Sequence, residues 1–388
     1  MTDFGLALLL ILVWVYVIGT QILALRFARR RIVAAPGVKP LGIAPDSGPP
    51  VSVLKPLHGA EPGLSDNLRS FADQDYPVFE LVLGVRDRAD SALPVARALI
   101  RERPFCDVAL VIDRRAAGSN LKVANLENMM PAARYDVILL ADSDMRVTRD
   151  YLAAVTAPLR DPGTGIVTCL YKGVPTGGLW SRLAAMHINF GFLPGALAGD
   201  ALDIGGGCFG ATIALRRDVL ERLGGFARLR NELADDHRLG SAVRGLGLAS
   251  VLSPYIVENR VSEPSFASLW RHELRWARTS RAMAPAGFAG SVITHTVMVT
   301  ALAVSVWGLD EPAWGCVGIS MLLRWLSALI TARALDLPRG GLWLLPLRDA
   351  LSFAVFLSSF FGRSVFWRDQ LFRVEPSGQM TVEGDKPI

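Results

Sequence analysis

The chain has 388 residues, a length that suits about two structural units at roughly 100–200 residues per domain. Apolar residues make up 51% of it, so composition alone does not mark a membrane protein. The formal charge of +5 would suit nucleic acid, but no segment interleaves basic and aromatic residues as nucleic-acid-binding modules do. An anionic membrane surface is therefore the simpler partner, and no nucleic-acid partner is expected.

The first long apolar segment, residues 4–25, carries no charge and is long enough, at about 1.5 Å per residue, to cross a hydrocarbon core of roughly 30 Å. The residues that follow it are strongly basic: Arg26, Arg29, Arg30 and Arg31. A cleaved secretory signal, the alternative, has its positive charge before the apolar run instead. We therefore expect residues 1–31 to form an uncleaved transmembrane anchor, with the next domain in the cytoplasm.

The middle of the chain has the pattern of an α/β domain. Residues 32–50 are rich in Pro and Gly and predict a linker. Four short apolar runs follow, separated by helix-like stretches such as 93–103; the runs are 51–57, 79–85, 108–113 and 136–144. Such runs predict a mostly parallel sheet that is covered on both faces. In these sheets ligands bind beyond the carboxyl ends of the strands.

The C-terminal third contains three more long apolar stretches, 292–309, 314–330 and 342–361. The last two are interrupted by charges: Arg324, Arg348 and Asp349. Because a charge in lipid is costly, these side chains are expected to face protein, water or substrate. Basic residues flank both ends of 342–361, which predicts a re-entrant or interfacial segment rather than a full crossing.

Acidic residues stand at the ends of two expected strands. Asp142 and Asp144 leave the fourth strand with one residue between them, and two such carboxylates suit Mg²⁺ or Mn²⁺ bound to a diphosphate. The alternative is a solvated start of a loop. Asp87 closes the second strand, where it either accepts hydrogen bonds from a nucleotide base or ribose, or caps the next helix.

Residues 118–125 follow the third strand and open a helix. Free amide groups at a helix N-terminus bind anions, and Lys122 would add a positive charge. An ordinary capped helix with an exposed lysine is an equal alternative. Further on, Asp235 and Asp236 lie in a helix expected to begin near Glu232. The helix dipole alone favours acidic residues in a first turn. The functional alternative is that one of the two carboxylates acts as a general base.

The segment HELRW precedes the C-terminal apolar stretches. At helical spacing His272 and Trp276 share one face, with Arg275 beside them. Trp and Arg near a membrane are common as interfacial anchors. The functional alternative is that Arg275 holds a diphosphate while Trp276 packs under a sugar or acceptor.

In order and combination these segments resemble the family 21 glycosyltransferases, which include ceramide glucosyltransferases and bacterial hopanoid-associated enzymes. The likeness runs from VSVLKPLHGAEPGLSDNLRSFADQDYP through GVRDRAD, GSNLKVANL, ADSDMRV, FGATIALRRDVLERLGGF, LADDHRLG and HELRWART to FWRDQLFRVEPSG. The resemblance implies a GT-A catalytic domain over residues 51–285, membrane or re-entrant helices over 286–365 and a cytoplasmic tail over 366–388.

The family pattern of three separated aspartates followed by Q/R-x-x-R-W also implies roles for single residues. Asp87 matches the aspartate that contacts the nucleotide, and Asp142 matches the second, with Asp144 completing a divalent metal site. Asp236 matches the presumed catalytic base. The nucleotide-sugar site would further include Lys122, His272, Arg275 and Trp276. Two departures stand out: His272 replaces the Gln or Arg of the pattern, and the animal ceramide enzymes have Gly at the position of Asp144.

The resemblance implies inverting transfer of glucose or N-acetylglucosamine from a UDP-sugar to the hydroxyl of a membrane lipid, giving a β-linked glycolipid. The phrases TCLYKGVP, RHELRWARTSRA and LSPYIVE favour a hopanoid polyol over ceramide, and with it the bacterial inner membrane. Two alternatives stay open. A processive polysaccharide synthase needs a channel, for which three or four spans are few. If the protein bound UDP-sugars without catalysis, Asp236 and Arg275 would have no evident role.

Overall fold

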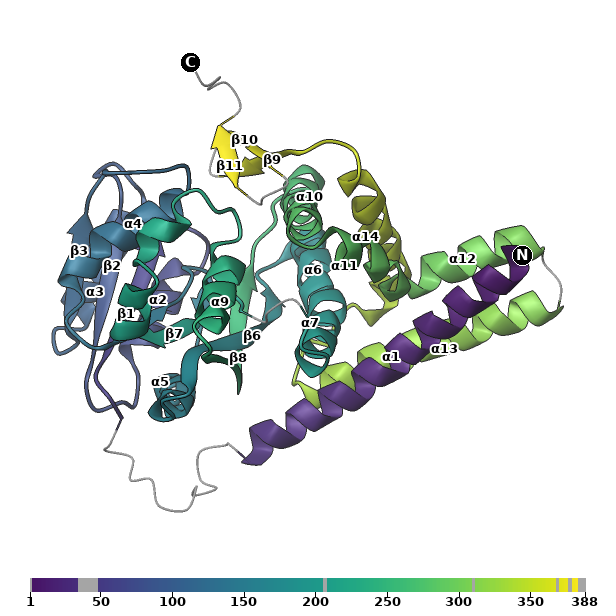
Figure 1. Cartoon of the computed structure of the whole chain (residues 1–388), viewed down its shortest axis with the longest axis horizontal. Coiled ribbons are helices and arrows are strands. Elements are labelled where there is room, and N and C mark those ends of the chain that lie inside the picture. Colours follow the sequence, from purple (N-terminus) through teal and green to yellow (C-terminus); the bar gives the residue numbers. More distant parts are fainter. Residues whose placement is uncertain are drawn as a thin grey trace.

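The computed structural model describes residues 2–33, 48–204, 208–308, 311–367, 370–375 and 379–382. Within these ranges the main sheet has eight strands, in the order β3-β2-β1-β4-β7-β6-β8-β5 (Figure 1). The four expected runs form one half of this sheet: β1 (Val51–Leu57), β2 (Phe79–Val85), β3 (Val108–Ile112) and β4 (Val137–Leu140). All three pairings among them are parallel, as the apolar runs predicted.

The other half of the sheet is mixed. Its strands are β5 (Met145–Arg146), β6 (Thr164–Pro175), β7 (Ile213–Arg216) and β8 (Ala249–Val261). Strand β7 lies antiparallel between β4 and β6, whereas β6 and β8 are parallel to each other. Parallel pairs predominate, so the expected α/β GT-A fold is confirmed.

Helices cover both faces of the sheet, because side chains of each strand alternate between two cores. On β1, Val51 and Val53 pack on one face and Leu54 on the other. The first face is covered by α2 (Leu64–Ala72), α3 (Ala92–Glu102) and α5 (Tyr151–Thr156), and the second by α4 (Leu121–Met129), α8 (Arg217–Arg222) and α9 (Asp235–Gly245). The expected helix 93–103 is thus found one residue earlier, as α3.

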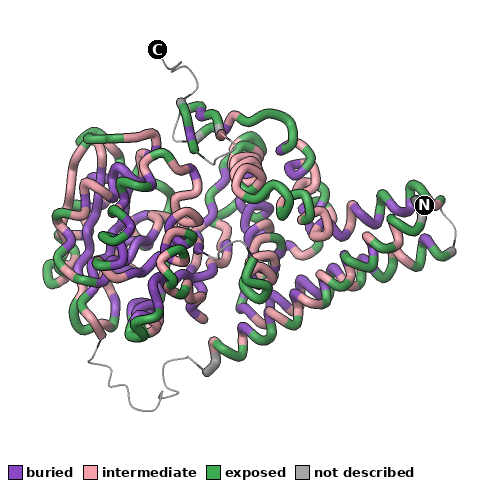
Figure 2. The backbone as a smooth tube through the Cα atoms, in the orientation of Figure 1, coloured by how far each residue is buried: buried purple, intermediate pink, exposed green. Residues whose placement is uncertain are grey.

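Long apolar helices extend from this domain (Figure 1): α1 (Thr2–Val33), α12 (Thr296–Trp307) and α13 (Glu311–Ala334). Three helical segments of the described chain are long and apolar enough to cross a membrane, 4–31, 312–334 and 342–359, and the bent pair 285–294 and 296–307 would make a fourth if it were one span. The valines Val13, Val17 and Val299 pack α1 against α12. Exposed residues run along the outer sides of α1 and α13 (Figure 2).

A separate apolar cluster joins the catalytic sheet to these helices. It contains Leu170 of β6, Ala24 and Phe27 of α1, and Ala328 and Ala332 of α13. Further members come from α6 (Gly178–His187), α7 (Leu193–Ala201) and α10 (Phe266–Met283). The cluster fixes the β6–β8 side of the sheet, and not the β3 side, next to the membrane-type helices.

The charges inside the apolar stretches face protein, as expected. Arg324 of α13 donates two hydrogen bonds to Asp349 of α14 (Leu345–Ser359), at 2.8 and 2.7 Å. Arg348 donates to both carboxylate oxygens of Glu273 on α10, at 2.6 and 2.7 Å. Both pairs are almost completely buried, so each charge has its partner inside the protein.

The expected C-terminal tail, residues 366–388, contributes to a small antiparallel sheet in its described part. The strands are β9 (Ser364–Trp367), β10 (Gln370–Val374) and β11 (Met380–Val382). The Met380 amide donates to the Asn231 carbonyl at 2.8 Å, which ties this sheet to the catalytic domain. Residues 34–47 of the expected linker lie outside the described residues.

Candidate active site

The loop 142–144 leaves the sheet at the carboxyl end of β4, where the sequence placed the site. Each of its three carbonyls accepts a hydrogen bond from the surrounding domain. The Lys55 ammonium donates to the Asp142 carbonyl, the Asn67 side-chain amide to that of Ser143 at 3.1 Å, and the Arg260 backbone amide to that of Asp144 at 2.9 Å. The loop backbone is therefore fixed along its whole length.

The two carboxylates of this loop have different environments. The Asp142 side chain is 33% exposed, and its Oδ1 lies 2.7 Å from the Lys122 Nζ. Asp144 Oδ2 accepts a hydrogen bond from the Asn259 side chain at 2.7 Å, whereas its Oδ1 is buried and has no hydrogen-bond partner among the described residues. Burial, together with the charges of Asp142 and Glu61, raises the pKa of Asp144 to about 7.

Lys122 brings separate acidic segments together. Its Nζ, 2.7 Å from Asp142 Oδ1, also lies 3.7 Å from Asp235 Oδ2, and Asp236 acts on it electrostatically. Burial opposes the charge, but the surrounding carboxylates outweigh it and raise the pKa of Lys122 above its ordinary value. The lysine is thus not an exposed residue of an ordinary helix.

Asp236 lies at the start of α9, which begins at Asp235 rather than near Glu232. Its Oδ2 accepts a hydrogen bond from the Gly210 amide at 2.9 Å and its Oδ1 one from the His237 amide at 2.7 Å. Burial first, and the neighbouring Asp235 second, raise the pKa of Asp236 to about 6. A carboxylate with this pKa is ionised at neutral pH and still basic enough to accept a proton.

Gly210 shows how closely these groups converge. A Cβ atom at this position would lie 3.2 Å from Asp236 Oδ2, and 3.6 Å from both Asp142 Oδ2 and Lys122 Nζ. Three side chains from the ends of β4, α4 and α9 therefore surround one point. Any side chain at position 210 would enter the space between them.

Several amides in and after the loop 118–120 are hydrogen-bonded within the protein, so they are not free to bind an anion. The Asn120 side chain caps α4 and accepts hydrogen bonds from the Lys122 and Val123 amides, at 3.0 and 3.1 Å. The Ser119 amide donates to the Asn231 side chain at 3.0 Å. The capped-helix alternative is therefore correct for these amides, and the loop holds the segment that precedes Asp235.

Asp87 lies at the same carboxyl edge, separated from β4 by β1. Its Oδ1 accepts a hydrogen bond from the Ala89 amide at 2.9 Å, and its Oδ2 one from the Arg114 guanidinium at 2.7 Å. Asp87 does not cap α3, because the Asp90 side chain accepts from the Ala92 amide instead. The contacts of Asp87 are with Arg114 and its own turn, and Asp142 and Asp236 are not among them.

The HELRW segment lies on α10. His272 Nδ1 is 2.7 Å from Glu263 Oε1, so one polar side of this ring is occupied. The Trp276 ring lies 4.3 Å from the His272 ring and 6.2 Å from that of His187, centroid to centroid. Arg275 acts electrostatically on Tyr171, as do the carboxylates of the site, so its guanidinium contributes to the electrostatics of the same group of residues.

Three residues of the site were not predicted from the sequence: Lys55, Tyr171 and Asn259. Lys55 is fully buried on β1, and its Nζ lies 3.8 Å from the centroid of the Phe71 ring. A charge within the apolar run VSVLKPL was the available signal, since lysine is almost never fully buried without a partner. Nothing in the sequence pointed to Tyr171 and Asn259, because it is the order of strands in the sheet that brings β6 and β8, and these residues with them, to the site.

Tyr171 adds an aromatic side to the site. Its ring stacks on Phe192 at 4.6 Å, and Phe192 meets Phe209 edge-on at 5.4 Å. Burial and the charges of Asp236, Asp144 and Asp142 raise the pKa of the Tyr171 hydroxyl well above its usual range. The hydroxyl is therefore a neutral hydrogen-bond donor next to the carboxylates.

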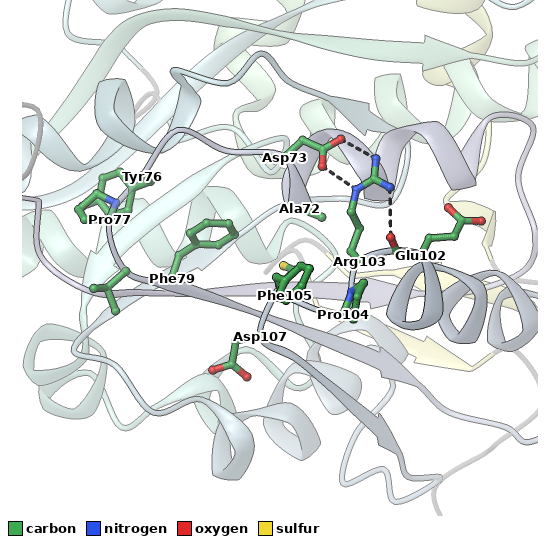
Figure 3. A pocket seen from close by; sticks show the side chains of 12 residues that line it. Ala72, Asp73, Tyr76, Pro77, Phe79, Glu102, Arg103, Pro104, Phe105 and Asp107 are labelled. Atoms are coloured by element: carbon green, nitrogen blue, oxygen red, sulfur yellow. Dashed lines mark hydrogen bonds and ion pairs between the residues drawn. The ribbon is translucent and has the colours of Figure 1, made fainter.

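A surface hollow of about 590 Å³ lies elsewhere, at the opposite edge of the sheet (Figure 3). It is lined by residues at the start of β2 and before β2 and β3, among them Tyr76, Phe79 and Asp107. Arg103 in this hollow is held by Asp73 through hydrogen bonds of 2.7 and 3.0 Å. Because it lies at the amino ends of the strands, this hollow is not part of the candidate site.

A divalent cation fits the 142–144 loop by its donor chemistry. Hard oxygen ligands are present, and the unpartnered Oδ1 of Asp144 is a buried acceptor that a cation would satisfy. Among the described residues no three His, Cys, Asp or Glu side chains are grouped so as to hold an ion. Substrate phosphates and water would therefore supply the remaining ligands of the cation, as they commonly do for Mg²⁺.

Acidic groups gathered at the carboxyl edge of a mostly parallel sheet suit a glycosyltransferase with the GT-A architecture, and the apolar helices beside them suit a membrane-associated protein. The model of glycosyl transferase family 21 matches residues 9–380. The chain therefore belongs to this family, as the sequence motifs indicated.

Its relatives include ceramide glucosyltransferases. Ceramide glucosyltransferase 1 of Caenorhabditis elegans is 25% identical over 238 residues, which are 61% of this chain and 51% of that protein. Ceramide glucosyltransferase 3 of the same organism is 24% identical over 350 residues, 86% of this chain and 74% of that protein. The match thus spans about half the length of the first relative and three quarters of the second.

Solved structures also show similarity. A mannosyltransferase from Pyrobaculum calidifontis in complex with GDP-Man and Mn²⁺ has a TM-score of 0.49 at 20% identity, covering 92% of this chain and 99% of that one. The S. aureus TarS fragment 1–349 in complex with UDP-GlcNAc has a TM-score of 0.39 at 15% identity, covering 87% and 100%.

Proposed function

We propose that this protein transfers a sugar, glucose or N-acetylglucosamine, from a UDP-sugar to the hydroxyl of a membrane lipid at the cytoplasmic face. A hopanoid polyol is favoured over ceramide as the acceptor. The observation that carries this proposal is the convergence of Asp142, Lys122 and Asp236 around Gly210, on the side of the sheet that adjoins the membrane-type helices.

The donor would lie along the carboxyl edge of the sheet. Asp87, at the end of β2, would accept hydrogen bonds from the base or ribose, and the 142–144 loop would bind near the diphosphate. A Mg²⁺ or Mn²⁺ ion bound by Asp142 and Asp144 would offset the negative charge of the departing UDP. Lys122 and Arg275 supply fixed positive charges for the same group.

The acceptor would approach from the side of α1 and α13. Asp236 would take the proton of the attacking hydroxyl while the sugar–phosphate bond breaks on the opposite face of the anomeric carbon, so the configuration inverts. The amides of Gly210 and His237 hold the Asp236 carboxylate in a fixed orientation for this task. Trp276 and the Tyr171 ring offer apolar faces for the sugar or the lipid.

The experiment is to incubate purified protein with several UDP-sugars and a bacterial lipid extract, and to identify the product by mass. We expect a β-linked glycolipid with a single sugar and free UDP. Asp236→Asn should bind the UDP-sugar normally and turn over about 10²–10⁴-fold more slowly. Asp66→Asn, in an exposed ion pair on α2, is the control and should keep its activity.

The outcomes separate the alternatives. A polymeric product would identify a processive synthase, and UDP-sugar binding without transfer to any lipid would identify a non-catalytic binding protein. Equal turnover in Asp236→Asn and the unaltered protein would remove Asp236 as the base. Activity that survives EDTA would remove the metal role of Asp142 and Asp144.

A further inference from the structure

Lys55 is a fully buried lysine directly beneath the 142–144 loop. Its side chain is 0% exposed and lies on the face of the sheet that α2 covers. An ammonium group away from water costs several kcal/mol unless hydrogen bonds and opposite charges compensate it. The substrate-binding and proton-transfer steps proposed above do not use this residue.

The hydrogen bond of Lys55 goes to the loop. Its Nζ donates to the Asp142 carbonyl and lies 3.8 Å from the Phe71 ring centroid. The carboxylates that act on it electrostatically are Asp144, Asp142 and Glu61. One side chain thus binds the backbone of the loop and lies close to its carboxylates.

The neighbouring carbonyls are held in the same way, but by neutral groups. Asn67, 1% exposed on α2, donates to the Ser143 carbonyl at 3.1 Å. The Arg260 amide of β8 donates to that of Asp144. Lys55 is therefore the only one of these three donors that can carry a charge, and it holds Asp142, whose side chain is 33% exposed.

We propose that Lys55 is a positioning residue that holds the 142–144 loop in its cation-binding conformation before substrate arrives. This inference rests on the proposed function, because it assumes a cation and a diphosphate at the loop. The hydrogen bond from the Lys55 Nζ holds the Asp142 carbonyl, and with it the backbone of the loop, in one position before the ligands bind. Less free energy is then lost in ordering the loop when the ligands bind.

Whether the removal of Lys55 weakens or tightens Mn²⁺ binding tests this role. A lysine that only adds positive charge near the site repels a cation, so its removal would tighten cation binding. A positioning residue has the opposite effect. We expect Lys55→Met to weaken Mn²⁺ binding by about 10–100-fold, the loss typical of residues that support metal ligands. Mn²⁺ is titrated into purified protein at fixed UDP concentration, and the free ion is measured by electron paramagnetic resonance.

Lys172→Met is the matched control. Lys172 is also largely buried, 13% exposed, but its Nζ donates to the Asp336 carbonyl at 3.1 Å, away from the 142–144 loop. Its Mn²⁺ affinity should stay unchanged. If Lys55→Met does not fold, Asn67→Leu tests the same loop at the Ser143 carbonyl and should weaken Mn²⁺ binding as well.

Tighter or unchanged Mn²⁺ binding in Lys55→Met would overturn the positioning role. So would unchanged binding in Asn67→Leu if that variant has to serve instead. The readout needs neither the lipid nor the correct sugar, so a wrong acceptor in the proposed function leaves it intact. Absence of Mn²⁺ binding to the unaltered protein would overturn both the metal role and this inference, and that outcome is distinct from a loss confined to Lys55→Met.

Discussion

At the scale of single residues, Asp236 makes the activity depend on pH. Its pKa, raised to about 6 by burial and Asp235, means that the carboxyl is protonated below that pH and cannot accept a proton from the acceptor. We expect kcat/KM to rise with pH and to level off above about pH 7. The measurement is a pH profile of sugar transfer with the donor held below its KM.

The variant Asp235→Asn tests whether the pH dependence comes from Asp236. Removing the neighbouring negative charge lowers the pKa of Asp236, because the ionised form is then less disfavoured. The rise in kcat/KM should shift to lower pH in this variant. A shift to higher pH, or none, would contradict the assignment of the rise to Asp236.

The individual residues also show what a sequence can and cannot predict. Asp142, Lys122 and Asp236 were expected as site residues because acids and small polar loops at strand ends are visible in the sequence. The amides near residues 119–123 were left open between an anion site and a capped helix, because the acceptors Asn120 and Asn231 reach them through contacts that only the folded chain makes. The contacts of Asp87 with Arg114 likewise needed the adjacent end of β3.

At the scale of elements, α10 is fastened to α14 by the buried pair of Glu273 and Arg348, with side chains 3% and 1% exposed. This pair fixes the helix that carries His272, Arg275 and Trp276. Removing one partner leaves the other charge buried without compensation, which typically costs about 3–5 kcal/mol. We expect Glu273→Gln to lower the free energy of unfolding in detergent by about that amount.

The matched comparison is the exposed pair of Arg69 and Glu102, each 38% exposed. Glu102→Gln should change stability by less than about 1 kcal/mol, since water and salt screen such pairs. The double variant Glu273→Gln/Arg348→Met should be less destabilised than Glu273→Gln alone. Equal losses in the buried and the exposed pair would refute this account.

The C-terminal strands act on the site through the segment before Asp235. The Met380 amide donates to the Asn231 carbonyl, and Ser119 Oγ donates to the Met380 carbonyl at 3.1 Å. Leu233 packs with Val365 and Phe372 in a small core of its own. Truncation after Gly362 should therefore increase hydrogen exchange in residues 229–236 and lower kcat, while exchange in β1 to β3 stays unchanged.

The predictability of elements follows their burial. Strands β1 to β4 are near-continuous apolar runs, so their positions were readable to within a few residues. Strands β6 and β8 mix polar with apolar residues, because part of each lines the site. Their sequences therefore lack the regular hydrophobic pattern from which a strand can be predicted. The small C-terminal sheet buries only a few side chains against the catalytic domain, which is too weak a pattern to distinguish it from a tail.

At the scale of the whole molecule, the apolar helices and the catalytic domain share one packed cluster. Ala24 and Phe27 of α1 pack with Leu170 of β6, so the basic end of α1 adjoins the sheet. Further along α1, Ile11 and Val15 are 52% and 61% exposed, as lipid-facing residues would be. The lipid acceptor that we propose would therefore approach the sheet from the end of α1 where the sequence becomes basic.

The charge pattern predicts which side of the membrane this is. Arg26, Arg29, Arg30 and Arg31 follow the apolar part of α1, and basic flanks remain in the cytoplasm. In a protein whose four cysteines are replaced by alanine, Phe4→Cys should react with a membrane-impermeant maleimide applied outside sealed, right-side-out vesicles. Asp66→Cys in the catalytic domain should react only after the vesicles are opened. Labelling of Asp66→Cys from outside would place the site on the opposite face, where UDP-sugars of the cytoplasm could not reach it.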